Sequence, residues 1–319
     1  MRTRICFLLL AATAVFADTK ATLVEHRKVW DQGQHNAFTD LIQFKGKWYM
    51  TFRESQSHVG DDGALRVLVS KDGQAWESAA LLTSKVADLR DPHLSITGRN
   101  ELMLTGGIRH LKTPRPPNDT HAWFSADGKK WSVPVQIGES GLWLWNMDWY
   151  KGAAYSIGYD GGGEKFIRLY RSADGRKFER LWQRDHANES SIAFGPDGTA
   201  YCLLRRDHKP DNSGQIGIAK PPYTDWKWRN LNAQTGGPKM IRLPDGRFIA
   251  TVRLYDGKRR TSVCQVDVEN AKITEVLTLP SGGDTSYAGM VFYRGLIWMS
   301  YYSSHEGKTS IYFAKVRIE

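Results

Sequence analysis

The stretch SSIAFGPDGTAYCLLR, residues 190–205, contains two short apolar runs on either side of the turn Pro196-Asp197-Gly198. Each run has the length of a β-strand, and Asp-Gly between two such runs is a strong signal for a β-hairpin. The same layout, preceded by a short polar or glycine segment, recurs five more times. The other copies are residues 37–54, 92–108, 146–159, 239–253 and 287–301.

The spacing of these hairpins predicts the architecture. The repeats start near residues 37, 92, 146, 190, 239 and 287, so the period is 44 to 55 residues. Further strand-like runs follow the hairpins at residues 64–69, 167–170, 262–266 and 310–316. Repeats of this length with four strands each are typical of a β-propeller. We therefore predict an all-β fold, a six-bladed β-propeller of four-stranded antiparallel blades, in which residues 21–30 supply the last blade's outer strand and close the ring.

Composition agrees with an all-β protein. The chain has 319 residues, 41% of them hydrophobic, with 12 Trp, 13 Tyr, 12 Phe and 30 Gly. Many aromatic residues and glycine-rich turns favour short strands over helices, and no helical periodicity of useful length occurs. A pair of β-sandwiches is the alternative architecture, but the even spacing along the whole chain argues against it.

The N-terminus has the features of an export signal. Arg2 and Arg4 precede an apolar run over residues 5–15, and Val15-Phe16-Ala17 fits a cleavage site. We predict a signal peptide over residues 1–17 and one propeller domain over 18–319, secreted or periplasmic, with no stable membrane insertion after cleavage. An uncleaved anchor is the alternative.

Two cysteines, Cys202 and Cys264, remain after cleavage, and both fall within predicted strands. We expect two buried free thiols, although export would permit a disulfide. No Cys/His spacing is typical of a zinc site, so we expect no metal and no cofactor.

The charge balance favours an anionic partner. The formal net charge is +10 and falls to +8 when Arg2 and Arg4 are removed. An anionic glycan is the partner we expect, because no basic stripe indicates nucleic-acid binding. We expect a monomer.

A turn that occurs in three repeats introduces a family resemblance. It is SKDGQAW at residues 70–76, SADGKKW at 125–131 and SADGRKF at 172–178. This turn resembles the Asp-box of sialidases and related propellers. The Asp side chain can cap backbone N–H groups and Gly can adopt a positive φ, so the turn is structural and carries no chemistry.

The resemblance extends to positions that carry chemistry in sialidases. That family uses a Tyr/Glu nucleophile pair, an Asp acid/base and three Arg residues that bind the sugar carboxylate. Glu189 opens the fourth repeat and Arg205 closes its second strand 16 residues later, which is similar to the family's segment from Glu to the second Arg. Tyr287 in GGDTSYAGM resembles the nucleophile segment.

The remaining family positions are less well defined. Arg259 and Arg260 lie where the third Arg is expected, and Arg253 competes with them. Asp62, in a Gly-Asp-Asp-Gly loop, occupies the acid/base region. Arg53, Glu54 and His58 share that loop and could supply an alternative acid/base.

One departure bears on the substrate. The family's first Arg opens blade one, where this chain has His35-Asn36-Ala37-Phe38. Arg53 or Arg90 could take its place.

Ring geometry predicts the same site independently. The inner strands of a propeller start around one axis, which brings together a set of chemically diverse side chains. These are His35, Asn36, Arg90, Asp91, Trp145, Asn146, Glu189, residues 237–239 and Tyr287. Arg90 with Asp91 is either a sugar-binding pair or an ion pair that locks its blade, and Trp145 either stacks on a sugar or belongs to the core.

The residues and the resemblance lead to three functional hypotheses. The first is a glycoside hydrolase similar to an exo-α-sialidase, which cleaves a terminal acidic sugar with Tyr287 as nucleophile, Glu189 as its base and Asp62 as acid/base. A neutral Tyr suits an anionic sugar, which a carboxylate nucleophile would repel. The second is a glycosidase acting on a non-sialic sugar, and the third is a non-catalytic glycan-binding propeller.

Overall fold

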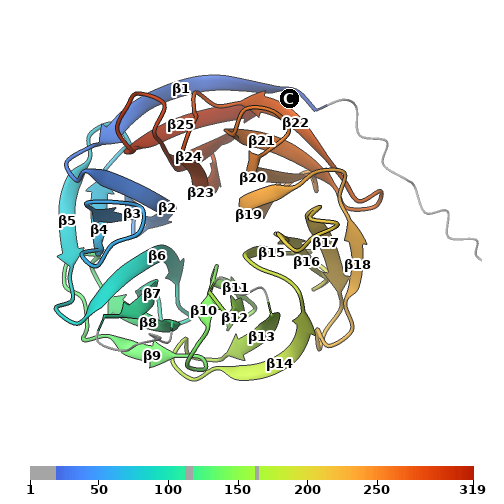
Figure 1. Ribbon diagram of the computed structural model, residues 1–319, viewed down its shortest axis with the longest axis horizontal. Helices are drawn as coiled ribbons and strands as arrows, with labels where there is room; N and C mark the ends of the chain where they lie inside the picture. Colours follow the sequence, from blue (N-terminus) through green and yellow to red (C-terminus); the bar gives the residue numbers. More distant parts are fainter. Residues whose placement is uncertain (1–18, 112–117, 162–164) are drawn as a thin grey trace, which may run out of the picture.

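The computed structural model describes residues 19–111, 118–161 and 165–319, which form six antiparallel sheets around a central axis (Figure 1). The predicted six-bladed β-propeller is confirmed. The predicted signal peptide, residues 1–17, lies outside the described residues. Among the described residues there is no helix with the length and apolar character needed to cross a bilayer.

Three blades come from the first half of the chain. Blade one contains β2 (His35–Phe44), β3 (Lys47–Ser55), β4 (Ala64–Ser70) and β5 (Glu77–Leu82). Blade two contains β6 (Ala87–Ile96), β7 (Leu102–His110), β8 (Asn118–Ser125) and β9 (Val135–Ile137). Blade three contains β10 (Trp143–Leu144), β11 (Asp148–Tyr150), β12 (Ala153–Tyr159), β13 (Phe166–Ser172) and β14 (Glu179–Asp185). In blade three, β10 and β11 both pair with β12, so they are the two halves of one interrupted inner strand.

The second half of the chain completes the ring. Blade four contains β15 (Ser190–Phe194), β16 (Ala200–Leu204), β17 (Gln215–Ala219) and β18 (Lys227–Asn230). Blade five contains β19 (Thr235–Arg242), β20 (Phe248–Leu254), β21 (Arg260–Asp267) and β22 (Lys272–Thr278). Blade six contains β23 (Thr285–Tyr293), β24 (Leu296–Ser303), β25 (Ser310–Ile318) and β1 (Ala21–Trp30).

The N-terminal strand closes the ring as the sequence predicts. β1 pairs antiparallel with β25, from Ala21 opposite Ile318 to Trp30 opposite Ile311. Figure 1 shows β1, in blue, lying outside the red strands of the last blade. Because the first and last strands share one sheet, β1 covers the outer edge of β25 and joins the two ends of the chain in one blade.

The three Asp-boxes have the structural role that was expected. In the first, Asp72 Oδ1 accepts a hydrogen bond from Gln74 N at 2.8 Å, and Ser70 Oγ accepts one from Gly73 N at 2.9 Å. Gly73 has a φ of +77°, which favours glycine. Asp127 and Asp174 repeat the capping contact in their own boxes.

The core lies between neighbouring blades, whose faces pack against each other. Both Cys202 and Cys264 are buried there as free thiols, as predicted. The inner strands β23 and β2 approach each other closely at Gly289, where a Cβ would lie 2.1 Å from Leu41 N and 2.6 Å from the carbonyl carbon of Asp40. Backbone atoms cannot move aside as a flexible side chain can.

We expect Gly289→Ala to lower the free energy of unfolding by about 3 kcal/mol, because overpacking against fixed backbone is costly. Urea denaturation followed by tryptophan fluorescence would measure it. Gly98→Ala is the matched control, because a Cβ there meets nothing closer than 3.9 Å. Its effect should stay within about 0.5 kcal/mol. Equal losses in the two variants would contradict the close approach of blades one and six.

Candidate active site

The inner strands are distorted at the same level in four blades. The register shifts between Ala37 and Asp40, Arg90 and His93, Gly236 and Lys239, and Ser286 and Gly289. Within these bulges, positive φ angles occur at Phe38 (61°), Asp91 (44°), Gly237 (54°) and Tyr287 (50°). A bulge redirects a side chain, and a non-glycine residue at positive φ costs of order 1–3 kcal/mol and is typical of functional sites. The distorted positions mark the mouth of the propeller as the candidate site.

Glu189 and Tyr287 are paired across the mouth. Tyr287 Oη donates a hydrogen bond to Glu189 Oε1 at 2.7 Å, and Arg205 Nη1 donates to the same carboxylate oxygen at 2.9 Å. Arg205 Nη1 also lies 3.0 Å from Tyr287 Oη and donates to it. The other oxygen, Glu189 Oε2, accepts a hydrogen bond from Gly237 N at 2.9 Å. Three residues that the sequence predicted as functional are thus in direct contact.

Gly237 is required by this geometry. Its φ of +54° favours glycine, and a Cβ on it would lie 2.8 Å from the ring of Tyr287. The bulge therefore brings the Gly237 N–H to Glu189 and leaves space for the phenol at the same time.

Aromatic groups surround Tyr287. Its ring lies edge-on to Phe38 at 5.2 Å and to Trp145 at 5.7 Å, and the Arg253 guanidinium lies over it at 5.2 Å. Burial raises the pKa of the Tyr287 phenol well above its usual value, and the negative charge of Glu189 acts in the same direction. The phenol is therefore protonated, and it can act as a nucleophile only if a base takes its proton.

Arg253 is held by protein acceptors next to Tyr287. Its Nε donates to Thr285 O at 2.8 Å, and its Nη2 donates to Tyr302 Oη at 3.0 Å. Nη2 also pairs with Asp284 Oδ1 at 3.3 Å. Of the three candidates for the third Arg, Arg253 lies at the mouth. Arg259 is exposed, and Arg260 forms ion pairs with Glu275 and Asp256, so neither is brought to the mouth.

Blade two contributes a charged network. Asp88 is fully buried. Its Oδ1 accepts hydrogen bonds from Arg53 Nη2 at 2.7 Å and from Gly63 N at 2.9 Å. Its Oδ2 accepts one from Arg90 Nη1 at 3.2 Å. Arg53 is 0% exposed, so it has no surface to offer a ligand. Arg90 also lies 3.9 Å from Asp91 Oδ2. Burial raises the pKa of Asp91, with Arg90 opposing this and Glu189 adding to it.

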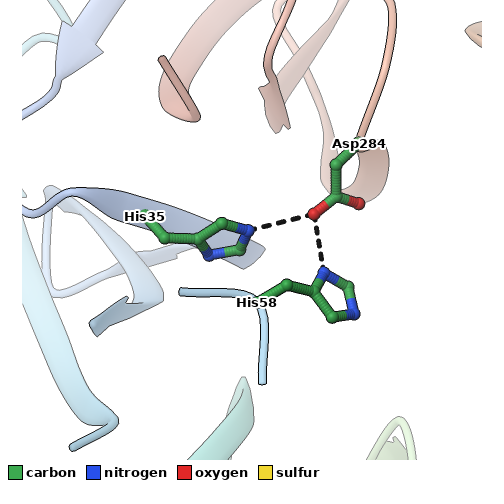
Figure 2. A group of neighbouring side chains, drawn as sticks. All are labelled: His35, His58 and Asp284. Atoms are coloured by element: carbon green, nitrogen blue, oxygen red, sulfur yellow. Dashed lines mark hydrogen bonds and ion pairs between the residues drawn. The ribbon is translucent and has the colours of Figure 1, made fainter. Parts of the chain in front are cut away.

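A third group links blades one and six. His35 Nε2 lies 3.0 Å and His58 Nδ1 lies 2.6 Å from Asp284 Oδ2. Figure 2 shows both imidazoles turned toward that carboxylate. Among the described residues, these are the three His, Cys, Asp or Glu side chains that lie close enough to share a metal ion. The Arg253 cation on the same carboxylate opposes a second positive charge there, which favours a hydrogen-bonded group over a metal centre.

The predicted acid/base, Asp62, lies in the exposed loop between β3 and β4. Its Oδ2 accepts a hydrogen bond from Gln56 N at 2.9 Å, which closes this loop. His58, an alternative acid/base from the same loop, contacts Asp284 and Phe38 at the mouth. Trp145, at the break between β10 and β11, is buried against Tyr287 and His93.

Sequence reasoning missed Asp284 and Asp88. Asp284 precedes β23 in GGDTSY, three residues before Tyr287, and the rule that residues at inner strand starts face the axis could have included it. Asp88 lies two residues before Arg90, and the sequence pattern indicated only Arg90 and Asp91 in this segment. No local pattern marks either carboxylate as a partner of residues in another blade.

The sequence matches no family model and no curated protein. Solved structures match over the whole ring. A protein of unknown function from Dyadobacter fermentans has a TM-score of 0.82 at 20% identity, covering 94% of this chain and 99% of that one. A GH93 α-L-arabinofuranosidase of Fusarium graminearum has a TM-score of 0.72 at 12% identity, covering 92% and 98%. The Trypanosoma rangeli sialidase has a TM-score of 0.70 at 14% identity, covering 94% of this chain and 60% of that one. At these identities the likeness establishes a shared fold, the six-bladed propeller of these glycosidases.

Proposed function

We propose that this chain is a retaining exo-glycosidase whose nucleophile is Tyr287. The observation that carries the proposal is the 2.7 Å hydrogen bond from Tyr287 Oη to Glu189 in the buried mouth of the ring. A hydroxyl nucleophile within hydrogen-bond reach of a base that is itself held in place is the arrangement that covalent catalysis requires. The fold supports the proposal, because sialidases and an arabinofuranosidase share it.

The contacts support a double displacement. As Tyr287 Oη attacks the anomeric carbon, its proton passes to Glu189 Oε1 and the bond to the leaving oxygen breaks. The N–H of Arg205 that lies on the phenol oxygen stabilises negative charge as it develops there. Gly237 N holds the second oxygen of Glu189, so the base cannot rotate away. Water then displaces the tyrosine from the sugar, and the configuration is retained.

The leaving oxygen also needs a proton. The loop between β3 and β4 supports this step, because it carries the ionisable side chains of Asp62 and His58, and His58 contacts Asp284 and Phe38 at the mouth.

A terminal acidic sugar, sialic acid in particular, is the first candidate substrate. A Tyr nucleophile presents no negative charge to an anionic sugar, whereas a carboxylate nucleophile would repel it. A neutral sugar is the second candidate, and a specific observation favours it. The guanidinium groups at the mouth are already paired with protein carboxylates: Arg205 with Glu189 and Asp207, Arg253 with Asp284, and Arg90 with Asp88.

A substrate panel tests the function and separates the two candidates. We expect the purified protein to release 4-methylumbelliferone from either the α-sialoside or the α-L-arabinofuranoside. The first sugar product, observed by ¹H NMR before mutarotation, should have the anomeric configuration of the substrate. An inverted product would exclude the covalent mechanism. No release from a wide range of aryl glycosides would favour the non-catalytic glycan-binding propeller instead.

A further inference from the structure

The group formed by His35, His58 and Asp284 is not used in the steps above. Asp284 lies just before β23, His35 begins β2, and His58 lies in the loop after β3. Both imidazoles contact one carboxylate oxygen, Asp284 Oδ2, at 3.0 Å and 2.6 Å (Figure 2). The group thus connects the loop of blade one to the strand that carries Tyr287.

The carboxylate between the two rings is fixed on both of its oxygens. Asp284 Oδ1 accepts a hydrogen bond from Tyr302 Oη at 2.8 Å and pairs with Arg253 Nη2 at 3.3 Å. Although burial acts to raise the pKa of Asp284, hydrogen bonds from His35, His58 and Tyr302 hold it well below its usual range. Asp284 is therefore ionised at neutral pH, and contacts on both oxygens fix its orientation.

The two histidines differ in their exposure to solvent. The His35 side chain is 9% exposed, whereas that of His58 is 48% exposed. His58 Nδ1 faces Asp284, so the other ring nitrogen, Nε2, is the one that can exchange a proton with a bound molecule. In a histidine acid/base, a carboxylate typically accepts a hydrogen bond from Nδ1 and so fixes the tautomer, while Nε2 exchanges the proton with the reacting group.

His58 also lies close to the nucleophile. Its ring is edge-on to Phe38 at 5.3 Å, and Phe38 is edge-on to Tyr287 at 5.2 Å. At most one phenyl ring thus separates His58 from Tyr287. The charged and titratable groups around His58 are Asp284, His35 at 5.5 Å between ring centroids, and Arg53, which donates to His58 O.

We propose that His58, oriented by Asp284, is the general acid/base of the proposed glycosidase in place of Asp62. In the first step, His58 Nε2–H gives its proton to the leaving oxygen as the glycosidic bond breaks and Tyr287 Oη bonds to the anomeric carbon. The Tyr287 proton passes to Glu189. In the second step, neutral His58 takes a proton from water as the water oxygen bonds to the anomeric carbon. The bond between that carbon and Tyr287 Oη breaks, and Glu189 returns a proton to Tyr287. Asp284 is a positioning residue and exchanges no proton.

Leaving-group dependence tests this role, which rests on the proposed function. His58→Asn places an amide where Nδ1 lies, so it can still donate to Asp284, but it has no Nε2. For an alkyl glycoside of the preferred sugar, which needs a proton on its leaving oxygen, we expect kcat/KM to fall by about 10²–10⁴-fold. For the 4-methylumbelliferyl glycoside, whose leaving group departs without full protonation, the fall should be about tenfold or less. Azide, which attacks without a base, should accelerate the variant and yield a glycosyl azide of retained configuration.

The controls separate the possible outcomes. His121→Asn, a His→Asn change on β8 in an outer part of blade two, should leave both substrates unaffected. Equal losses on the alkyl and aryl glycosides, with no effect of azide, would overturn the role of His58 but not that of Tyr287. If the parent protein hydrolysed no glycoside, the proposed function and this role would both fall.

A second measurement does not depend on turnover. In ¹⁵N-histidine NMR of the parent protein, His58 in its neutral form should carry its proton on Nδ1. Asp284→Asn should relax this preference toward Nε2. A parent protein with the proton on Nε2 would overturn the proposal, because Nε2 could then not accept the proton of water in the second step. Loss of activity in EDTA with recovery in Zn²⁺ would likewise overturn it and make the three residues metal ligands.

Discussion

Tyr287→Phe is expected to lower kcat/KM for the preferred aryl glycoside by about 10³-fold or more, because it removes the atom that would bond to the sugar. The change deletes only Oη. Glu189 keeps its hydrogen bonds from Arg205 Nη1 and Gly237 N, so the fold of the mouth should persist. Steady-state kinetics with 4-methylumbelliferyl glycosides would measure the loss, and thermal denaturation would confirm that the variant is folded.

Glu189→Gln should produce a loss of similar size, since the raised pKa of Tyr287 means that the phenol needs a base. The double variant should be about as active as either single variant, because the two groups act as one unit. Multiplicative losses would contradict the pair mechanism.

Tyr49→Phe is the matched control for Tyr287→Phe. Tyr49 Oη donates to Asp127 O at 2.9 Å, at the packing of blade one on the second Asp-box. This change should cost about 1 kcal/mol of stability and leave kcat/KM unchanged. A Tyr287→Phe variant as active as Tyr49→Phe would exclude Tyr287 as the nucleophile.

Asp88→Asn is expected to lower the free energy of unfolding by about 3–5 kcal/mol, because it leaves a buried guanidinium without its counter-ion. Asp88 and Arg53 are both 0% exposed and lie 2.7 Å apart, and Arg90 depends on the same carboxylate. Urea denaturation at neutral pH would give the value from the midpoint, provided that the m-value is unchanged.

A surface ion pair provides the comparison for Asp88→Asn. Asp245 and Arg247 lie 2.7 Å apart, and the Asp245 side chain is 47% exposed. Asp245→Asn should cost less than about 1 kcal/mol, because solvent screens the pair. Equal losses in the two variants would contradict the prediction that the buried network of Asp88, Arg53 and Arg90 stabilises the packing of blade one against blade two.

The candidate site could be predicted in part. Glu189 and Tyr287 were predicted from their places at inner strand starts and from the resemblance to sialidases, and Arg205 was predicted from that resemblance; the structure brings the three into contact. The choice among Arg253, Arg259 and Arg260 could not be made, because neighbouring residues on a strand point to opposite faces and a bulge shifts which face is which. The register of blades five and six turns Arg253 toward the ring of Tyr287 and turns Arg260 toward Glu275.

The sequence by itself determined the six blades, since each hairpin and each Asp-box is specified by residues close together in the chain. Only the tertiary structure decided which groups meet at the mouth. His58 and Asp284 are 226 residues apart, and Tyr287 and Glu189 are 98 apart. The physical reason is that strand periodicity is local, whereas contacts across the axis depend on ring closure and on the bulges at Phe38, Asp91, Gly237 and Tyr287, which no repeat pattern predicts.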